Sequence, residues 1–566
     1  MKVFVIISLM LMLSGCGGEE RGDNVFLWVT GNVDNSINPH NSAALANMEI
    51  VDLIVAPLYG WFVGGDGAYL APRMAAEVPH SLDGRTWIIP VDPRARFANG
   101  TPITAHTFVD SWRMGLCPDL SYTHAIQIAH RIIEIKNAEA YLTQDPPTDW
   151  ADVGIRALDD HTLEIITTKI YTEWEVMLHF AHRPTAPIYM PLYEAGMNAE
   201  RTSTLYGTGL DYFMGNGPFM LTSWTPGSER VFVRNEYYLH ADLISLDGIH
   251  GRVVPDENTR IIMFENGLSD FYLLGPAGVA HFGDDPRIVN YDRLPIRTIE
   301  VNQNHPVKEI LADPLFRRAL YFAIDRAAIA RLTHNIPAPY FLSTVGLFAG
   351  GVPFRDMDGA NDWLPPDYGF DADRAVRYMQ EALSAHGLDY ISLNLVYSED
   401  IAALRMVSEF IQYEWARIFG GALHISLRAM PHTAVTALMR TSVAAQSDQW
   451  DLAWSGWNFA AEMFSPHAKF AAYQSTAPNR FTNYQNAFLD EHFPLFATDA
   501  IRLDDQARLE LTIALERYLI LEDVTCIPVF QERGHALFSE RVRLPMEGYA
   551  PGLGFGWHLS GIGSRD

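Results

Sequence analysis

The chain has 566 residues, more than a single hydrophobic core usually contains, and we expect two or three domains. Apolar residues make up 48% of it, and 13 Trp, 24 Tyr and 30 Phe can fill a core and also line a large cavity. The formal net charge of −27 argues against nucleic acid and anionic lipid headgroups as partners, because the chain would repel both.

The first residues indicate a secretory leader that ends in a lipid anchor. Lys2 supplies a positive start, and residues 3–12 form an apolar run too short to span a bilayer. Residues 13–16 read Leu-Ser-Gly-Cys, the pattern of a bacterial lipobox, so we expect removal of residues 1–15 and acylation of Cys16. Residues 16–23 are small and polar and predict a flexible tether. An ordinary cleaved leader is the alternative, and either one places the chain outside the cytoplasm.

Strand-like and helix-like stretches alternate along the rest of the chain, without an internal repeat. The predicted strands and helices, in chain order, are strand 25–30, helix 48–58, strand 86–91, helix 105–115 capped by Thr104, strand 163–168, and helices 314–332, 372–385 and 402–419. Such a mixture predicts an α/β or α+β architecture. No other segment is long and apolar enough to cross a membrane.

Several motifs have a structural interpretation that we prefer to a functional one. Residues 159–161 (Asp-Asp-His) favour a turn over a metal site. His179 and His182 have helical spacing but no Cys or carboxylate at matching distance, so we expect packing and no metal. Charged residues at 317, 318, 325 and 326 predict a charged helix face with a capping role. Cys117 and Cys526 are too few for a disulfide scaffold, and whether they pair stays open.

The sequence lacks the common catalytic signatures. It contains no Gly-x-Ser-x-Gly elbow, no His-Glu-x-x-His helix, no phosphate-binding Gly-rich loop with Lys and no Gly-x-Gly-x-x-Gly. We therefore expect no catalytic residues, no cofactor and no enzyme activity. A hydrolase whose triad is scattered along the chain is the alternative.

A series of ordered motifs carries a family resemblance. The most specific block lies within residues 70–112 and includes Phe-Ala-Asn-Gly-Thr-Pro-Ile-Thr-Ala at 97–105. Further matches follow in order at residues 36–39, 58–60, 157–164, 215–219, 317–320, 325–326, 451–457 and 483–490. The chain resembles the extracytoplasmic solute-binding proteins of peptide ABC importers, the oligopeptide- and dipeptide-binding family 5, over essentially its whole mature length.

The resemblance implies an α/β, two-lobed periplasmic-binding-protein fold of type II, in its large three-domain variant. The implied layout is domain I from 24–50, 186–283 and 524–566, domain II from 51–185, and domain III from 284–523. The lobes would close around a ligand, because contacts made only in the closed form shift the population toward it.

The implied function is a lipid-anchored, monomeric receptor at the periplasmic side or cell surface of a bacterial membrane. It would capture a peptide or similar solute and deliver it to ABC permease and ATPase subunits. A peptide sensor or chaperone of the same fold is the alternative. Inner or outer membrane, ligand identity and ligand length stay open.

The resemblance also implies where the ligand binds. In the family, the stretch after the Gly-Trp pair at 456–457 runs along the ligand, and an aspartate three residues past this Trp meets the ligand ammonium. Here Ala460 stands in that place, and Glu462 and Asp34 are the candidate replacements. Trp454 is either a core residue or the counterpart of a basic side chain for the ligand carboxylate. The expected ligand contacts are Asp34, Asn35, Tyr122, Leu273, Trp457, Asn458, Phe459, Ala460 and Glu462.

Overall fold

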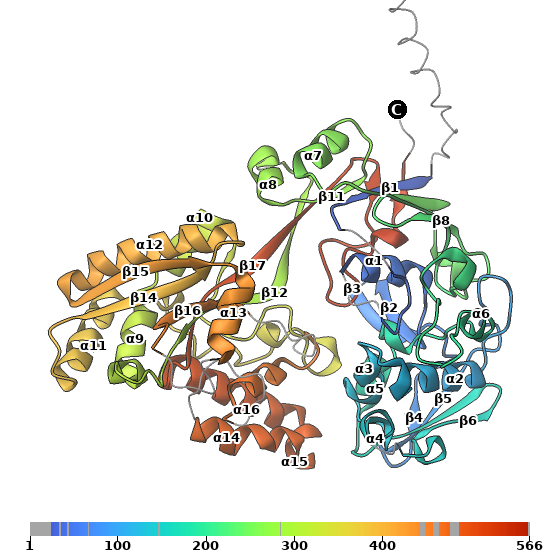
Figure 1. Ribbon diagram of the computed structural model, residues 1–566, viewed down its shortest axis with the longest axis horizontal. Helices are drawn as coiled ribbons and strands as arrows, with labels where there is room; N and C mark the ends of the chain where they lie inside the picture. The colour runs from blue at the N-terminus through green and yellow to red at the C-terminus, as the bar shows by residue number, and fades with distance from the viewer. Residues whose placement is uncertain are drawn as a thin grey trace, which may run out of the picture. The chain divides into compact units, whose positions relative to one another are not determined.

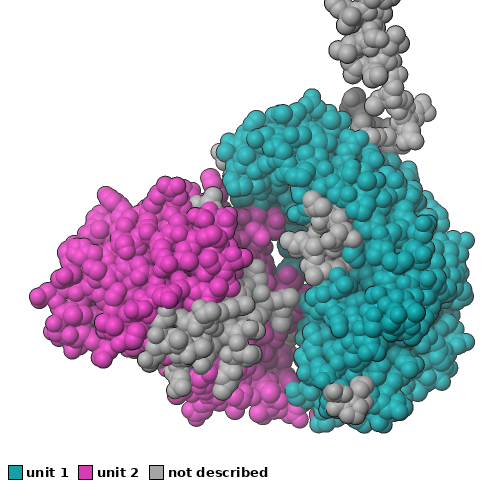
Figure 2. Space-filling model, in the orientation of Figure 1, with its two compact units in different colours: residues 1–169, 175–289, 535–566 teal, residues 170–174, 290–534 magenta. Residues whose placement is uncertain are grey.

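The computed structural model describes residues 24–32, 36–41, 45–65, 67–144, 148–283, 285–441, 448–456, 463–475 and 486–563. The chain forms two compact units, coloured separately in Figure 2. Unit 1 comprises Met1–Lys169, Glu175–Val289 and His535–Asp566, and unit 2 comprises Ile170–Trp174 and Asn290–Gly534. Within the described ranges, no helix is both long enough and apolar enough to cross a bilayer. The division into three domains stays a prediction.

Unit 1 is built on a mixed sheet of strands that lie far apart in the sequence (Figure 1). Its order is β17-β11-β1-β10-β9-β8, in which β1 pairs in parallel with both β10 and β11. The strands are β1 (Val25–Thr30), β8 (Phe219–Thr225), β9 (Glu229–Arg234), β10 (Gly248–Val253), β11 (Phe271–Leu273) and β17 (Cys526–Phe538). The predicted first strand, 25–30, is confirmed with both of its bounds.

Two smaller sheets and eight α-helices complete most of the described part of unit 1. The hairpin is β2 (Tyr59–Gly64) with β3 (Gly67–Pro72), and the other sheet, in the order β4-β5-β7-β6, has β4 (His80–Ser81), β5 (Thr86–Pro90), β6 (Ile155–Asp159) and β7 (Thr162–Ile166). The helices are α1 (Leu45–Ile54), α2 (Ala105–Gly115), α3 (Ala125–His130), α4 (Ala138–Thr143), α5 (Glu173–His179), α6 (Met190–Ala195), α7 (Glu257–Glu265) and α8 (Pro276–Phe282). Strands β18 (Val542–Arg543) and β19 (Gly561–Ile562) pair separately. Helix α5 begins in unit 2.

Local signals predicted these smaller elements well. Thr104 caps α2 as expected, because its hydroxyl accepts the Thr107 N–H at 3.4 Å while Thr107 Oγ1 accepts the Thr104 N–H at 3.1 Å. The Asp159 carboxylate accepts the His161 N–H at 2.8 Å and closes the predicted turn before β7. Strands β5 and β7 agree with the predicted ones to within two residues.

The predicted helix 48–58 is wrong at its C-terminal end, since α1 stops at Ile54. The Asn216 side chain, which is fully buried, accepts the Ala56 N–H at 2.9 Å and donates to the Ala56 carbonyl at 2.7 Å. A Cβ on Gly217 would lie 2.5 Å from the carbonyl carbon of Ile54, so only glycine admits this approach. The Gly-Asn-Gly motif at 215–217 thus ends α1 by contact from a distant part of the chain.

Unit 2 contains a sheet in the order β15-β14-β16-β12-β17, covered by helices on both faces (Figure 1). Its strands are β12 (Ile288–Val301), β13 (Ile336–Pro337), β14 (Ile391–Ser398), β15 (Leu423–Met430) and β16 (Leu452–Ser455), together with most of β17. The helices are α9 (Pro314–Phe322), α10 (Arg326–Thr333), α11 (Ala372–Ala385), α12 (Ala402–Phe419), α13 (His432–Thr441), α14 (Ala487–His492), α15 (Asp499–Arg502) and α16 (Asp505–Arg517).

Alternation along β14 shows how the helices are arranged. Leu393 and Leu395 belong to the main core, which includes Trp415 of α12, whereas Val396 packs in a separate cluster with Val435 of α13. Successive side chains of a strand point to opposite faces, so α12 and α13 cover opposite faces of the sheet. The predicted helices 372–385 and 402–419 are confirmed as α11 and α12.

The predicted single helix over 314–332 is wrong, because the chain breaks into α9 and α10. The Asp325 carboxylate accepts the Ala328 N–H at 2.8 Å and caps α10. The expected capping role is confirmed for Asp325, but the expected charged face is wrong at Arg317 and Arg326, which are fully buried. Arg317 donates to the Val524 carbonyl at 3.0 Å and Arg326 to the Pro528 carbonyl at 2.8 Å. These arginines satisfy backbone carbonyls at and before the start of β17.

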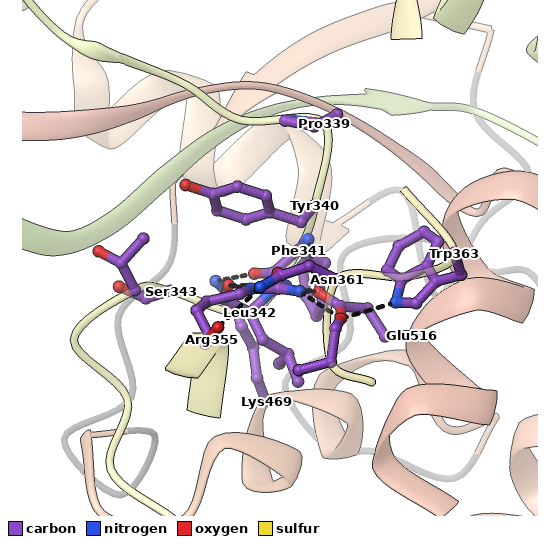
Figure 3. A network of polar contacts seen from close by, with 12 residues as sticks. Pro339, Tyr340, Phe341, Leu342, Ser343, Arg355, Asn361, Trp363, Lys469 and Glu516 are labelled. Carbon is purple, nitrogen blue, oxygen red and sulfur yellow. Dashed lines mark hydrogen bonds and ion pairs between the residues drawn. The ribbon is translucent and has the colours of Figure 1, made fainter. Parts of the chain in front are cut away.

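A buried polar network holds the segment 339–343 in unit 2 (Figure 3). The Glu516 carboxylate, on α16, accepts the backbone N–H groups of Phe341 at 2.9 Å and Leu342 at 2.7 Å, and forms an ion pair with Arg355. Arg355 also donates to the Leu342 carbonyl, and Lys469 donates to the Phe341 carbonyl at 2.9 Å. Figure 3 shows these side chains converging on one short stretch of backbone. The network joins residues that are up to 175 positions apart in the sequence, Phe341 and Glu516.

His179 and His182, the two histidines with helical spacing, each contact another polar group of unit 1. His179 is buried, where its Nε2 lies 3.2 Å from the Ile128 carbonyl, and His182 Nδ1 lies 2.9 Å from Arg131 Nη1. Burial lowers the pKa of His179 to about 3, which keeps its ring neutral. Within the described ranges, no three His, Cys, Asp or Glu side chains are grouped to hold a metal ion. Cys117 and Cys526 are both free thiols.

Candidate ligand-binding site

Strand β16 leads directly into the segment that follows Gly456 and contains most of the expected ligand contacts. It pairs antiparallel with β12, where Thr298 lies opposite Ser455, and parallel with β14. The strand ends at Ser455, and Gly456 is the last described residue before a gap. Seven expected contacts lie outside the described residues: Asp34, Asn35, Trp457, Asn458, Phe459, Ala460 and Glu462. Their roles therefore stay predictions, and the structure defines how the chain reaches them.

Asp451 anchors the start of β16. Its carboxylate accepts from Lys308 Nζ at 2.7 Å and from both the backbone N–H and the side-chain amide of Asn394, at 2.8 and 2.7 Å. The Asp451 side chain is 1% exposed, so these bonds operate away from water. His305 lies 3.3 Å away, and burial lowers its pKa despite the nearby carboxylate. Asp451, which precedes β16, is thus held both by Lys308 and by Asn394 of β14.

Trp454 belongs to the core. It is 3% exposed, and its indole N–H donates to Ser408 Oγ at 2.8 Å. Its ring also packs near Phe530 of β17, with centroids 6.1 Å apart. Of the two roles left open by the sequence, these contacts favour the core role, in which Trp454 positions β16.

Glu300 is a buried carboxyl beside β16. Glu300 is on β12, opposite Ala453 of β16. Its carboxyl group accepts hydrogen bonds from Thr298 Oγ1 at 2.8 Å and from the Tyr473 hydroxyl at 3.0 Å. Complete burial raises the pKa of Glu300 to about 7, since desolvation outweighs these hydrogen bonds. The carboxyl therefore changes charge near neutral pH inside the core of unit 2.

Three charged residues that sequence reasoning missed lie at the end of β16. Arg297 of β12 forms an ion pair with Glu532 of β17, and Arg293 donates to the other oxygen of Glu532 at 2.7 Å. The side chains of Arg297 and Glu532 are each 14% exposed. A Cβ on Gly456 would lie 2.5 Å from Arg297 Nη1, so the guanidinium lies against the backbone of Gly456. No motif marks these residues, because β12 and β17 are more than 200 residues apart in the sequence.

The two remaining predicted contacts lie in unit 1. Tyr122 is half-buried, and its hydroxyl forms a hydrogen bond with the Tyr193 hydroxyl, while its ring lies 5.6 Å from the ring of His40 in the early loop. Burial raises the pKa of Tyr122. Leu273 ends β11, paired with Ala536 of β17, and is 40% exposed. Tyr122 is thus linked to the early loop, whereas Leu273 belongs to the main sheet.

The match to a family model defines the class of protein. The model for bacterial extracellular solute-binding proteins, family 5 middle region, matches residues 70–481, and the chain belongs to this family. It is 24% identical over 444 residues to the oligopeptide-binding protein OppA of Bacillus subtilis, covering 74% of this chain and 76% of that protein. It is also 24% identical over 480 residues to the dipeptide-binding protein DppE of the same species, covering 83% and 80%.

A solved structure confirms the fold. The ABC transporter substrate-binding protein CtaP of Listeria monocytogenes superimposes with a TM-score of 0.73 at 18% identity, covering 95% of this chain and 99% of that one. The expected α/β solute-binding fold is therefore confirmed.

Proposed function

We propose that the chain is an extracytoplasmic receptor that captures a peptide and delivers it to an ABC importer. Membership of the solute-binding family over residues 70–481 supports it, as do the relatives named for oligopeptide and dipeptide binding. The observation that carries the proposal is β16, locked at Asp451 and leading into the ligand-assigned segment. An extended ligand can pair with such a segment through backbone hydrogen bonds, with side-chain recognition added at alternate positions.

The chain path supports a hinge between domains. Strands β12 and β17 each run from one unit into the other, at 289–290 and 534–535. We propose that unit 2 is domain III and that unit 1 contains domains I and II. Ligand contacts available only when the lobes close would shift the population toward the closed form, which then docks on the permease.

The first test identifies what the purified protein carries. Denaturing the mature chain and analysing the released small molecules by mass spectrometry should yield peptides in amounts close to one per protein molecule. A binding protein retains its ligand without changing it, so intact peptides and not fragments of one sequence are expected. If nothing is released, and a peptide pool added afterwards is not retained, the proposed function is wrong.

We further propose that Cys16 anchors the chain to the membrane. Expressed in bacteria with its leader, the wild-type chain should fractionate with membranes, and Cys16→Ser should move it to the soluble extracytoplasmic fraction, because the acylated thiol is lost. Cys117→Ser is the matched control and should stay with the membranes. Identical fractionation of wild type and Cys16→Ser would contradict the anchor.

A further inference from the structure

Arg131, at the C-terminal end of α3 in unit 1, is a half-buried cation. Its Nη1 donates to Gln127 Oε1 at 2.9 Å and to His182 Nδ1 at 2.9 Å. Both partners are uncharged, since burial lowers the pKa of His182 well below its usual value and keeps the ring neutral. Among the described residues, no carboxylate pairs with Arg131, so nothing in these contacts balances its charge.

Most of the donors of Arg131 have no acceptor. Its Nε is buried and lacks a hydrogen-bond partner in the part of the chain that the structure describes. Both printed contacts of the guanidinium use Nη1, so Nη2 is unused as well. Buried donors in folded proteins are nearly always paired, and a charged donor without a partner is the costliest case. The geometry therefore calls for an acceptor beside Arg131.

His182 and Arg183 add further donors next to it. Because Arg131 can only donate, His182 Nδ1 is the acceptor, and the proton of the neutral ring lies on Nε2, which has no acceptor among the described residues. Arg183 Nε donates to Asp52 Oδ1 at 2.9 Å, which leaves both Nη groups unused within the described ranges. Burial and next the charge of Arg183 lower the pKa of Arg131 to about 10, so the two guanidinium groups lie near each other.

The charge around Arg131, His182 and Arg183, which we call the basic cluster, is not balanced. Two guanidinium groups and the Asp52 carboxylate sum to +1, in a chain whose formal charge is −27. Asp52 is 60% exposed and contacts only the Nε edge of Arg183. A small anion between the guanidinium groups would relieve their repulsion and accept from the unused donors.

We propose that the basic cluster binds a small oxyanion, either inorganic phosphate or a small carboxylate. Both offer oxygen atoms that accept from the planar fork of a guanidinium, and such charge-assisted bonds are stronger than neutral ones. The His182 Nε2–H donates to the same anion and needs no change of protonation to do so. All three residues belong to unit 1, and the site invokes no peptide contact, so the inference goes beyond the proposed function.

The test titrates the mature protein with sodium phosphate and, separately, with sodium acetate, while sodium chloride keeps the ionic strength constant. Calorimetry gives the affinity and the number of sites, and thermal unfolding gives the midpoint. We expect one anion per chain to bind saturably, with a midpoint that rises as the site fills. The anion that binds more tightly identifies which of the two chemistries the site takes.

Variants assign the binding to these residues. Arg131→Gln should weaken it about tenfold or more, since the central guanidinium is lost while an amide can still donate to His182. Arg183→Gln and His182→Phe should each weaken it several-fold. Arg201→Gln is the matched control in unit 1, because Arg201 is 54% exposed and already gives both Nη groups to Glu194, and it should bind the anion as the wild type does.

Every outcome bears on the inference. If the wild type binds neither anion saturably, or if it binds with the same affinity as Arg131→Gln, then water alone satisfies these donors and the inference is wrong. Peptide capture would still stand in that case, because the titration involves no peptide. If Arg131→Gln does not fold, Arg183→Gln and His182→Phe decide the question, since unchanged affinity in both would overturn the site.

Discussion

Replacing Glu516 by Ala should lower the free energy of unfolding by about 3–5 kcal/mol, because it leaves a buried charge without its partner. Arg355, whose side chain is 6% exposed, would lose its only carboxylate partner among the described residues. The N–H groups of Phe341 and Leu342 would also lose their acceptor, and each unsatisfied donor adds to the cost. Urea and thermal unfolding, followed by circular dichroism, measure the change.

A surface ion pair provides the control for Glu516. Arg405 and Glu409 pair on α12 with side chains 72% and 55% exposed, and Glu409→Ala should change the stability by less than about 1 kcal/mol. Glu516→Gln should fall between the two, since it keeps an acceptor for the backbone but removes the charge. Equal losses of stability in Glu516→Ala and Glu409→Ala would show that the network of Figure 3 does not stabilise unit 2.

The wild type should lose stability as pH rises from 4.5 to about 7, because Glu300 ionises in the core, and Glu300→Gln should not show this loss. In the folded chain the pKa of Glu300 is raised from 4.5 to about 7, so between these values the folded state keeps a proton that the unfolded state has released. The contribution of Glu300 to stability is then most favourable below pH 4.5, falls through this interval, and is about 3 kcal/mol lower above pH 7. Gln does not titrate, and its amide oxygen still accepts from Thr298 and Tyr473.

The measurement is the free energy of unfolding from pH 4.5 to 8. Relative to the wild type, Glu300→Gln should be unchanged at the acid end and more stable by up to about 3 kcal/mol at pH 8. Glu409→Gln, on an exposed helix face, should follow the wild type throughout. Parallel curves for Glu300→Gln and the wild type would show that the buried carboxyl does not titrate in this range. Lys469 is the nearby cation that would then be stabilising its charged form.

Elements with local signals were predictable, and those shaped by distant contacts were not. The Thr104 cap and the apolar spacing of residues 402–419 lie within the elements that they define. The break between α9 and α10 was missed because the apolar pattern continues across it while Asp325 starts a new helix. Arg317 and Arg326 looked like surface charges, since the carbonyls that they satisfy lie about 200 residues further on.

The candidate site shows the same division. Asp451 and Gly456 were predicted from motifs of the family resemblance. The structure shows what Asp451 does: its buried carboxylate binds Lys308 and Asn394. The core role of Trp454 follows from its hydrogen bond to Ser408, which no local pattern reveals. The cluster of Arg293, Arg297 and Glu532 depends on β12 and β17 being neighbours in the sheet, a pairing that spacing within the sequence cannot predict. Tyr122 and Leu273 are described, but their contact with a ligand stays a prediction.

The most direct measurement of the central claim is a mass balance of peptides incubated with the purified chain. Quantitative mass spectrometry, performed after binding and after release by denaturation, should recover every peptide of the pool at its original mass, with the bound fraction saturating near one molecule per chain. Product peptides that accumulate with time beyond the amount of protein would show that the chain turns its ligand over, and the account of a receptor would fail.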